Sequence, residues 1–192
     1  MQTLTAPRAH VWTRRIYAQL IALGIFDAQH VELIEGHILD MTPMGSLHAT
    51  AVALTANVLE QAFGTGYFVR WQMPFGIGEL SEPEPDVAVV QGNIRDYVNA
   101  HPTTAALIVE ISDTSLDFDR TEKASLYATA GVADYWIVNL IARHVEILRD
   151  PVSDQDTPYG FSYRLRDTKR IDEDVSPLAL LHLSINVVDL MP

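Results

Sequence analysis

The stretch DRTEKASLYATAGVADYWIVNL, residues 119–140, decides the fold class of this chain of 192 residues. Asp119 and Glu122 are three positions apart, which is the spacing of a capping box, and they predict a helix over residues 119–130. Gly131 suits the end of that helix because glycine adopts the left-handed backbone of helix ends without strain. Asp134–Leu140 then follows as an apolar strand. A helix that leads into a buried strand predicts an α/β unit at the centre of the protein.

Helix and strand signals also alternate before this unit. Ala105–Ile111 (AALIVEI) is an almost continuous apolar run, which suits a central strand covered on both faces. Apolar residues at helical spacing predict helices over Thr13–Phe26 and Ser46–Phe63, with Thr13 and Ser46 as their caps. The remaining elements predicted here are a hairpin at Val31–Met41 that turns at Glu35-Gly36, and strands at Tyr67–Ile77 and Asp86–Val90.

The pattern continues more weakly toward the C-terminus. A strand is expected at His144–Leu148, a strand or flap at Tyr159–Arg166, and a short element at Ile185–Leu190. This order predicts one α/β domain over residues 1–192 with a central mixed α+β sheet flanked by helices. We expect a helical segment at 1–29, a core at 30–150 and C-terminal strands at 151–192.

Composition narrows the class of protein. The formal net charge of −12 argues against a general nucleic-acid coating protein, because such proteins present Lys and Arg to phosphates. An acidic chain can still act on nucleic acid when metal ions neutralise carboxylates or positive charge is concentrated locally. The absence of cysteine excludes disulfides and thiolate metal sites and fits the cytoplasm. We expect no signal peptide, no membrane span and no histidine-rich zinc site.

Two carboxylates stand where packing alone does not place them. Glu110 lies within the apolar run Leu107–Ile111, where a buried charge is costly unless a cation or hydrogen-bond donors meet it. Asp86 opens an apolar strand directly after Pro85. If these strands are neighbours, the pair offers two hard oxygen ligands to Mg²⁺. The alternatives are that Glu110 points to water at the strand's end and that Asp86 is an ordinary loop-to-strand junction.

Three further side chains are candidates. Lys123 shares a helical stripe with Tyr127 that should turn inward, although an exposed i,i+4 pair with Asp119 is an equally good interpretation. Glu32 and His48 are weaker candidates for catalytic residues. Glu32 fits the exposed face of a hairpin strand, and a histidine in the first turn of a helix is more often structural.

Several of these segments together resemble one family. They are VELIEGHILDMTP, the following His48, EPDVAVV, LIVEIS and DRTEKASLYATAGVADYWIVNL, from about residue 30 to residue 150. They are similar to the Uma2 family of restriction endonuclease-like proteins, within the PD-(D/E)XK nuclease superfamily. The spaced pattern D-x-x-E-K-x-x-x-Y-x-x-x-G-V-x-x-Y-W-I-V is its most specific part.

The resemblance implies a restriction endonuclease-like core with a divalent metal, Mg²⁺ or Mn²⁺, between Asp86 and Glu110. The superfamily's basic residue normally sits two positions after the second acid, where this chain has Ser112, and the following helix supplies Lys123 instead. Glu32 corresponds to a further acid that contacts the metal or its water. One departure concerns only a loop, since Asp113 stands where relatives often have proline.

The function expected from the residues and the resemblance is metal-dependent hydrolysis of phosphodiester bonds in nucleic acid, with DNA as the expected partner. Two alternatives stay open: a catalytically silent binding or assembly protein with a nuclease fold, and a hydrolase of a smaller phosphate ester. The hydrophobic run Tyr135–Val138 also suggests self-association, with a homodimer favoured.

Overall fold

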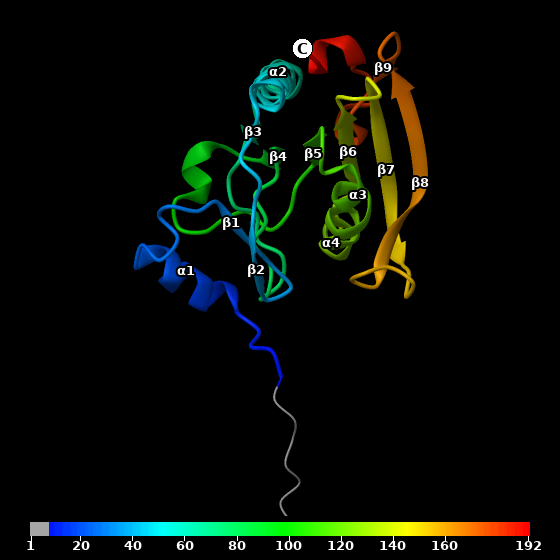
Figure 1. Cartoon of the computed structure of the whole chain (residues 1–192). Helices are drawn as coiled ribbons and strands as arrows, with labels where there is room; N and C mark the ends of the chain where they lie inside the picture. Colours follow the sequence, from blue (N-terminus) through cyan, green and yellow to red (C-terminus); the bar gives the residue numbers. More distant parts are fainter. Residues whose placement is uncertain (1–7) are drawn as a thin grey trace, which may run out of the picture.

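A six-stranded mixed sheet forms the centre of the computed structural model, which describes residues 8–192 (Figure 1). Its strand order is β3-β4-β5-β6-β7-β8, and only β5 and β6 run parallel. The strands are β3 (Tyr67–Arg70), β4 (Val87–Gln91), β5 (Leu107–Ser112), β6 (Asp134–Asn139), β7 (His144–Ser153) and β8 (Phe161–Arg170). The predicted α/β class with a mixed sheet is confirmed.

The two parallel strands lie at the centre because their sequences are apolar on both faces. All six residues of β5 and all six of β6 are buried. A parallel pair needs a crossover connection, usually a helix, and here it is one helical segment in three parts. These parts are α3 (Leu116–Phe118), the π-helical turn η2 (Asp119–Lys123) and α4 (Ala124–Thr129).

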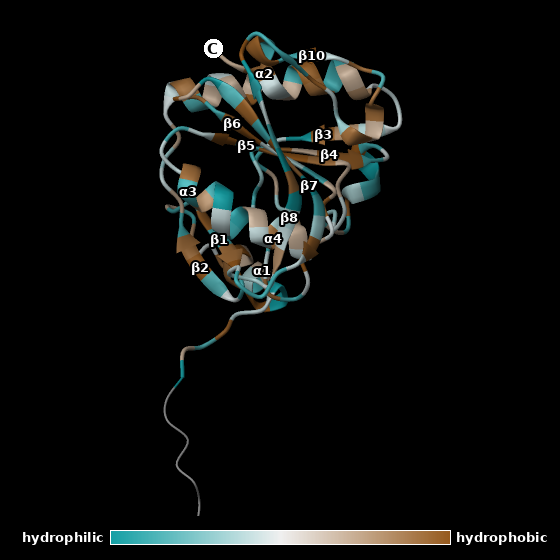
Figure 2. Cartoon of the chain, turned by 90° about the vertical axis from the view of Figure 1, so that its right-hand side faces the viewer, coloured by the Kyte–Doolittle hydropathy of each residue, from teal (hydrophilic) through white to brown (hydrophobic). Residues whose placement is uncertain are grey.

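Helices lie on both sides of the strands in Figure 2, and each face of the sheet has its own hydrophobic layer. On one face α2 (Ser46–Phe63) packs with the C-terminal turn η4 (Val187–Leu190) against a cluster that includes Val109 and Trp136. On the other face α4 covers a cluster that includes Ile108. Because side chains alternate along a strand, Glu110 lies on the same face as Ile108. This parity places its carboxylate beneath the helical segment.

The N-terminal elements form a subsidiary cluster. The helix α1 (Arg14–Ala22) begins at Thr13, whose side chain accepts a hydrogen bond from the Ile16 N–H. Its Tyr17 hydroxyl donates to the carbonyl of Val31 at 2.9 Å. The predicted hairpin is formed by β1 (Val31–Ile34) and β2 (His37–Asp40). Its two turn residues both have positive φ, 46° at Glu35 and 76° at Gly36, as a two-residue hairpin turn requires.

Two of the predicted helix starts are wrong. The central helical segment begins at Leu116 rather than Asp119, because Asp119 is buried and accepts a hydrogen bond from the Ser115 hydroxyl instead of capping a helix. Ser46 is the first helical residue of α2 rather than its cap, and Gly45 precedes it without any side-chain cap.

Two predicted elements are too long. The first helix ends at Ala22 instead of Phe26, since Gly24 has a φ of 73°. The strand predicted over Tyr67–Ile77 ends at Arg70, because Gln72 has a φ of 51° and the chain leaves the sheet there.

The C-terminal part contains more regular structure than predicted. Both β7 and β8 have ten residues. The short element expected at Ile185–Leu190 consists of a strand and the turn η4. The remaining elements are η1 (Ile94–Tyr97), β9 (Asp174–Val175), η3 (Leu178–Leu180) and β10 (Ile185–Asn186), with β9 paired to β10.

Three other predictions concern surfaces and ends. The run Tyr135–Val138 is fully buried within the chain and so offers no exposed surface for self-association. The homodimer therefore stays a prediction without that support. The first seven residues of the segment predicted at 1–29 lie outside the described residues. Within residues 8–192, no helix is long and apolar enough to cross a membrane.

A carboxylate–lysine cleft as the candidate active site

A cleft of about 520 Å³ opens where the hairpin, the start of α2, the strands β4 and β5 and the helical segment meet. The apolar residues of β4 and β5 pack in the two core layers. The acids of these segments, Asp86 and Glu110, line the cleft instead. Seven of its lining residues are acidic: Glu32, Asp40, Glu84, Asp86, Glu110, Asp113 and Asp119. So dense a group of carboxylates either takes up protons or requires positive charge nearby.

The two predicted acids lie next to each other on neighbouring strands. The backbone N–H of Asp86 donates to Glu110 Oε2 at 3.0 Å, and the N–H of Ile111 donates to Asp86 Oδ2 at 2.8 Å. Asp86 is the residue directly before β4. Glu110 lies inside β5, and 4% of its surface is exposed. The interpretation of Glu110 as a strand end that points to water is wrong.

Lys123 is brought to these acids from the helical segment. Its Nζ lies 2.6 Å from Glu32 Oε2 and 3.5 Å from Glu110 Oε1, and only 3% of the residue is exposed. The interpretation of Lys123 as an exposed partner of Asp119 is therefore wrong. Glu32 is 2% exposed, so it is not an exposed hairpin residue either. It lies in β1 and holds the amine in place.

His48 connects the helix on the opposite face to the cleft. It lies in the first turn of α2, and its Nε2 is 3.0 Å from Asp86 Oδ1. Its Nδ1 is 4.0 Å from Asp113 Oδ1. The structure therefore brings all five predicted residues, Asp86, Glu110, Lys123, Glu32 and His48, into one cleft.

Two residues of this arrangement were not predicted from sequence. The Tyr127 hydroxyl donates to Glu110 Oε1 at 2.6 Å. Asp119 is 4% exposed and accepts a hydrogen bond of 2.6 Å from the Ser115 hydroxyl. Their spacing from Lys123 could have identified them. Residues four apart on a helix share a face, so Asp119 and Tyr127 lie on the same side of the helical segment as Lys123.

Ser112 lies two positions after the second acid, where the resemblance implies that related nucleases have a basic residue. It lies two positions after Glu110 and therefore on the same face of β5. The residue is 1% exposed, and its Oγ has no hydrogen-bond partner among residues 8–192. On this face of the sheet the amine next to Glu110 comes from Lys123, on the helix that crosses it.

Burial determines the protonation of the central groups. It raises the pKa of the Glu110 carboxyl to about 8, against the opposing effect of Lys123. It also raises the pKa of Asp119 to about 6, against its hydrogen bond from Ser115. Burial alone lowers the pKa of Lys123, but Glu32 and Glu110 outweigh it and raise this pKa above its ordinary value. The lysine is consequently a permanent ammonium ion.

The donor set fits a hard divalent cation with few protein ligands. Among residues 8–192 no group of three or more His, Asp or Glu side chains forms a ready-made metal site. Asp86 and Glu110 do present carboxylate oxygens side by side. Three of the four oxygens accept one hydrogen bond each, and Asp86 Oδ1 lies 3.0 Å from His48 Nε2. Glu110 Oε1 also faces the Lys123 amine at 3.5 Å. Because each carboxylate oxygen has two lone pairs, the two acids retain acceptor capacity for a cation. Mg²⁺ needs one or two carboxylates because waters and substrate phosphate complete its coordination.

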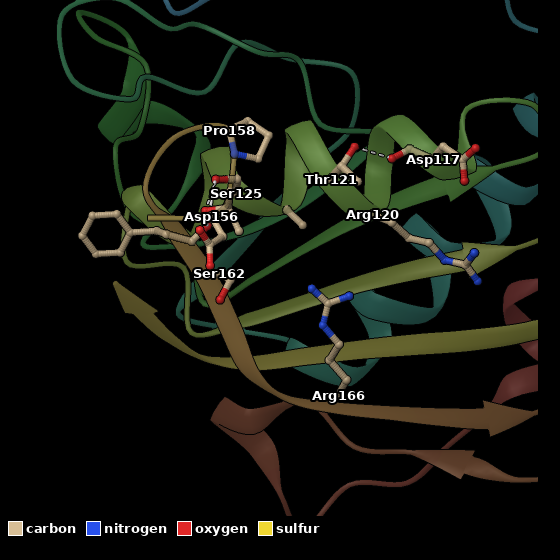
Figure 3. Close-up of a pocket in the computed structure, with 11 residues that line it drawn as sticks. Asp117, Arg120, Thr121, Ser125, Asp156, Pro158, Ser162 and Arg166 are labelled. Carbon is tan, nitrogen blue, oxygen red and sulfur yellow. Dashed lines mark hydrogen bonds between the residues drawn. The ribbon is translucent and has the colours of Figure 1, made fainter. Parts of the chain in front are cut away.

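A second cleft of about 380 Å³ lies beside the same helical segment (Figure 3). Several of its polar side chains are bonded within the protein. Arg120 donates two hydrogen bonds, of 2.8 and 2.6 Å, to Glu146, and the Thr121 hydroxyl donates to the carbonyl of Asp117. The Ser125 hydroxyl donates to the carbonyl of Phe161. None of the predicted site residues lines this cleft.

A solved structure has the same architecture. It is the "putative nuclease" from Anabaena variabilis, which matches with a TM-score of 0.66, 16% sequence identity, and coverage of 85% of this chain and 90% of that chain. At this identity the likeness concerns the fold alone. The mixed sheet, its two helical layers and the cleft on β4 and β5 thus define a nuclease fold of the restriction endonuclease-like class.

The family follows from the sequence as a whole. The Uma2 family model, described as "Putative restriction endonuclease", matches residues 17–187, and the chain belongs to this family. The predicted resemblance is confirmed, and the match extends beyond residues 30–150 in both directions. No curated protein matches the sequence. The family and the solved neighbour together indicate a nuclease.

Proposed function

We propose that the chain is a metal-dependent endonuclease that hydrolyses phosphodiester bonds of nucleic acid, with Asp86 and Glu110 holding Mg²⁺ or Mn²⁺. One observation carries the proposal. The buried ammonium of Lys123 lies 3.5 Å from Glu110 Oε1, while the other oxygen of Glu110 accepts the N–H of Asp86. Glu32, Glu110 and Lys123 are each at most 4% exposed. Taking an ion out of water costs several kcal/mol that its close partners must offset, and such clusters of buried ionisable groups in a cleft are typical of functional sites.

The residues divide the chemistry between them. When bound, the divalent ion polarises a phosphate oxygen and lowers the pKa of a coordinated water. Asp86 and Glu110 supply the hard oxygen ligands. Lys123 acts electrostatically, because its raised pKa leaves no free amine to accept a proton. A fixed positive charge stabilises the negative charge that develops on the phosphate in the transition state.

The surrounding side chains keep these groups in place. Glu32 holds the amine of Lys123 at 2.6 Å, and Tyr127 holds one oxygen of Glu110 at the same distance. His48 orients Asp86 from the opposite helix layer. Such supporting contacts commonly change metal affinity or activity 10- to 100-fold when removed.

Purified protein incubated with plasmid DNA or RNA and Mg²⁺ or Mn²⁺ tests the proposal. We expect cleavage that EDTA abolishes and that Asp86→Asn and Lys123→Met each remove. Asp117→Asn is the matched control, since Asp117 is an exposed acid on the same helical segment and outside this cleft. Absence of cleavage with every divalent ion tried contradicts the proposal for these substrates.

A catalytically silent binding or assembly protein is the second candidate. One observation favours it: among the lining residues that the structure describes, Lys123 is the single Lys or Arg side chain. Calorimetric titration with Mn²⁺ separates the two candidates. Binding that Asp86→Asn abolishes supports the enzyme, and no binding supports the silent protein. Cleavage of a small phosphodiester without cleavage of nucleic acid points to the third candidate, a hydrolase of small esters.

A further inference from the structure

The cleft has an apolar part that the proposed chemistry does not use. Phe118 comes from α3, Leu39 from β2, and Met41 and Met44 from the segment between β2 and α2. Met44 is 43% exposed. Leu39 and Phe118 are partly buried and pack against the core cluster under α4. We call these four residues the apolar wall. It lines the same cavity as the acids and Lys123.

The charges around the cleft do not suit a duplex. A protein that tracks double-stranded DNA neutralises several consecutive phosphates with Lys and Arg. Within residues 8–192 the lining contains seven acidic side chains against Lys123, which is buried and already faces two of them. The lining of the cleft therefore offers no row of cationic side chains to consecutive phosphates.

The size of the cleft suits a small occupant. Its volume of about 520 Å³ falls in the range of pockets that enclose small ligands. A groove for a duplex has to be long and open, because it contacts many phosphates. A single nucleotide has one phosphate for the charged part of the cleft and one flat apolar base for the other part.

From these observations we infer that the cleft takes an unpaired nucleotide, from a single strand or a locally opened duplex, with its base against the apolar wall. This inference rests on the proposed nuclease function and names its substrate class. Phe118 supplies an aromatic ring on which any base stacks, a contact that tolerates all four bases. Met41 and Met44 supply polarizable, adaptable side chains around it.

The test measures binding separately from cleavage. Short single strands of DNA and RNA that contain 2-aminopurine, and the matched DNA duplex, are titrated with the protein in Ca²⁺, and fluorescence reports stacking of the base. We expect quenching with a single strand and at least about tenfold weaker binding of the duplex. The logarithm of affinity should fall only slowly with that of salt, with a slope between about 0 and −1, because few phosphates are neutralised.

Two variants locate the base. Phe118→Leu keeps an apolar side chain in the core but removes the ring, and we expect about fivefold or greater loss of single-strand affinity, together with loss of quenching. Leu47→Ala is the control, because Leu47 lies in the first turn of α2, is 51% exposed and does not line the cleft. Its affinity should equal that of the unmodified protein.

The outcomes separate this inference from the proposed function. Duplex binding equal to or tighter than single-strand binding, or an unchanged affinity in Phe118→Leu, overturns the inference while metal-dependent cleavage still stands. Ring-dependent binding of single strands without cleavage in Mg²⁺ or Mn²⁺ supports the inference and contradicts the nuclease.

Discussion

Replacing Glu110 by glutamine measures the electrostatic cost of the candidate site. Burial raises the pKa of this carboxyl from 4.5 to about 8. One pKa unit corresponds to about 1.4 kcal/mol, so the ionised form costs the folded state up to about 5 kcal/mol. Because the pKa in the folded state is the higher one, the folded protein binds the extra proton. The stability that this proton provides is complete below pH 4.5 and is lost as the pH rises through 8.

Glu110→Gln removes this titration. The free energy of unfolding is measured by urea denaturation in EDTA. We expect the difference between Glu110→Gln and the unmodified protein to rise, in favour of the variant, by up to about 1.4 kcal/mol per pH unit between pH 5 and pH 8. The attraction between the Glu110 carboxylate and Lys123 exists only when Glu110 is ionised, so it is already part of the raised pKa. The changes in hydrogen bonding that come with the amide are the same at every pH. The test therefore uses the slope of this difference against pH. The size of the difference at any single pH is not used.

Glu146→Gln provides a control of opposite sign. Burial raises the pKa of Glu146, but the hydrogen bonds from Arg120 and His144 outweigh it, and the pKa is lowered. The stability that ionised Glu146 provides is therefore present near neutral pH and lost in acid. Compared with the unmodified protein, Glu146→Gln should be less stable mainly at pH values above the pKa of Glu146 in the unfolded chain. Parallel pH profiles for Glu110→Gln and the unmodified protein would refute the assigned burial of the Glu110 charge.

Three further substitutions probe single contacts. Lys123→Met leaves two buried acids without their cation and should destabilise the fold by about 3–5 kcal/mol in urea at pH 8; a loss below 1 kcal/mol contradicts the buried ion pairs. His48→Ala removes the support of Asp86 and should lower Mn²⁺ affinity about 10- to 100-fold by calorimetry, with part of it regained in His48→Asn. Asp134→Asn weakens the contact with Arg149 and should lower stability by more than about 1 kcal/mol without changing the metal affinity of the remaining folded protein, since Asp134 is remote from the cleft; a changed affinity contradicts its structural role.

Sequence patterns predicted most elements because their causes are local. Capping at Thr13 and the turn at Glu35-Gly36 depend on residues within a few positions of each other. The start of the central helical segment was mistaken for the same reason. Asp119 has the spacing of a cap, but its side chain is buried by residues that are distant in sequence, and no local rule reports that burial.

The contrast between two aspartates shows where sequence reasoning about sites ends. Asp86 and Asp134 both stand at the start of an apolar strand. Asp134 is fully buried and accepts hydrogen bonds from Arg149, Trp136 and the N–H of Leu178, so it is structural. Asp86 faces the cleft. The sequence set Asp86 apart by its place after Pro85, by a potential pairing with Glu110 and by the family resemblance. It could not show the contacts of either aspartate, because the partners of a carboxylate come from other elements.

What the sequence by itself determined is the alternation of strands and helices, the buried centre at β5 and β6, and the family. These follow from apolar periodicity and from a long spaced motif, and both depend only on the order and spacing of residues in the sequence. Only the tertiary structure decided that the amine of Lys123 faces Glu32 and Glu110, that Tyr127 completes the site, and that an apolar wall adjoins it. Those contacts join residues up to 91 positions apart, and their distances depend on how the sheet, hairpin and helix pack together.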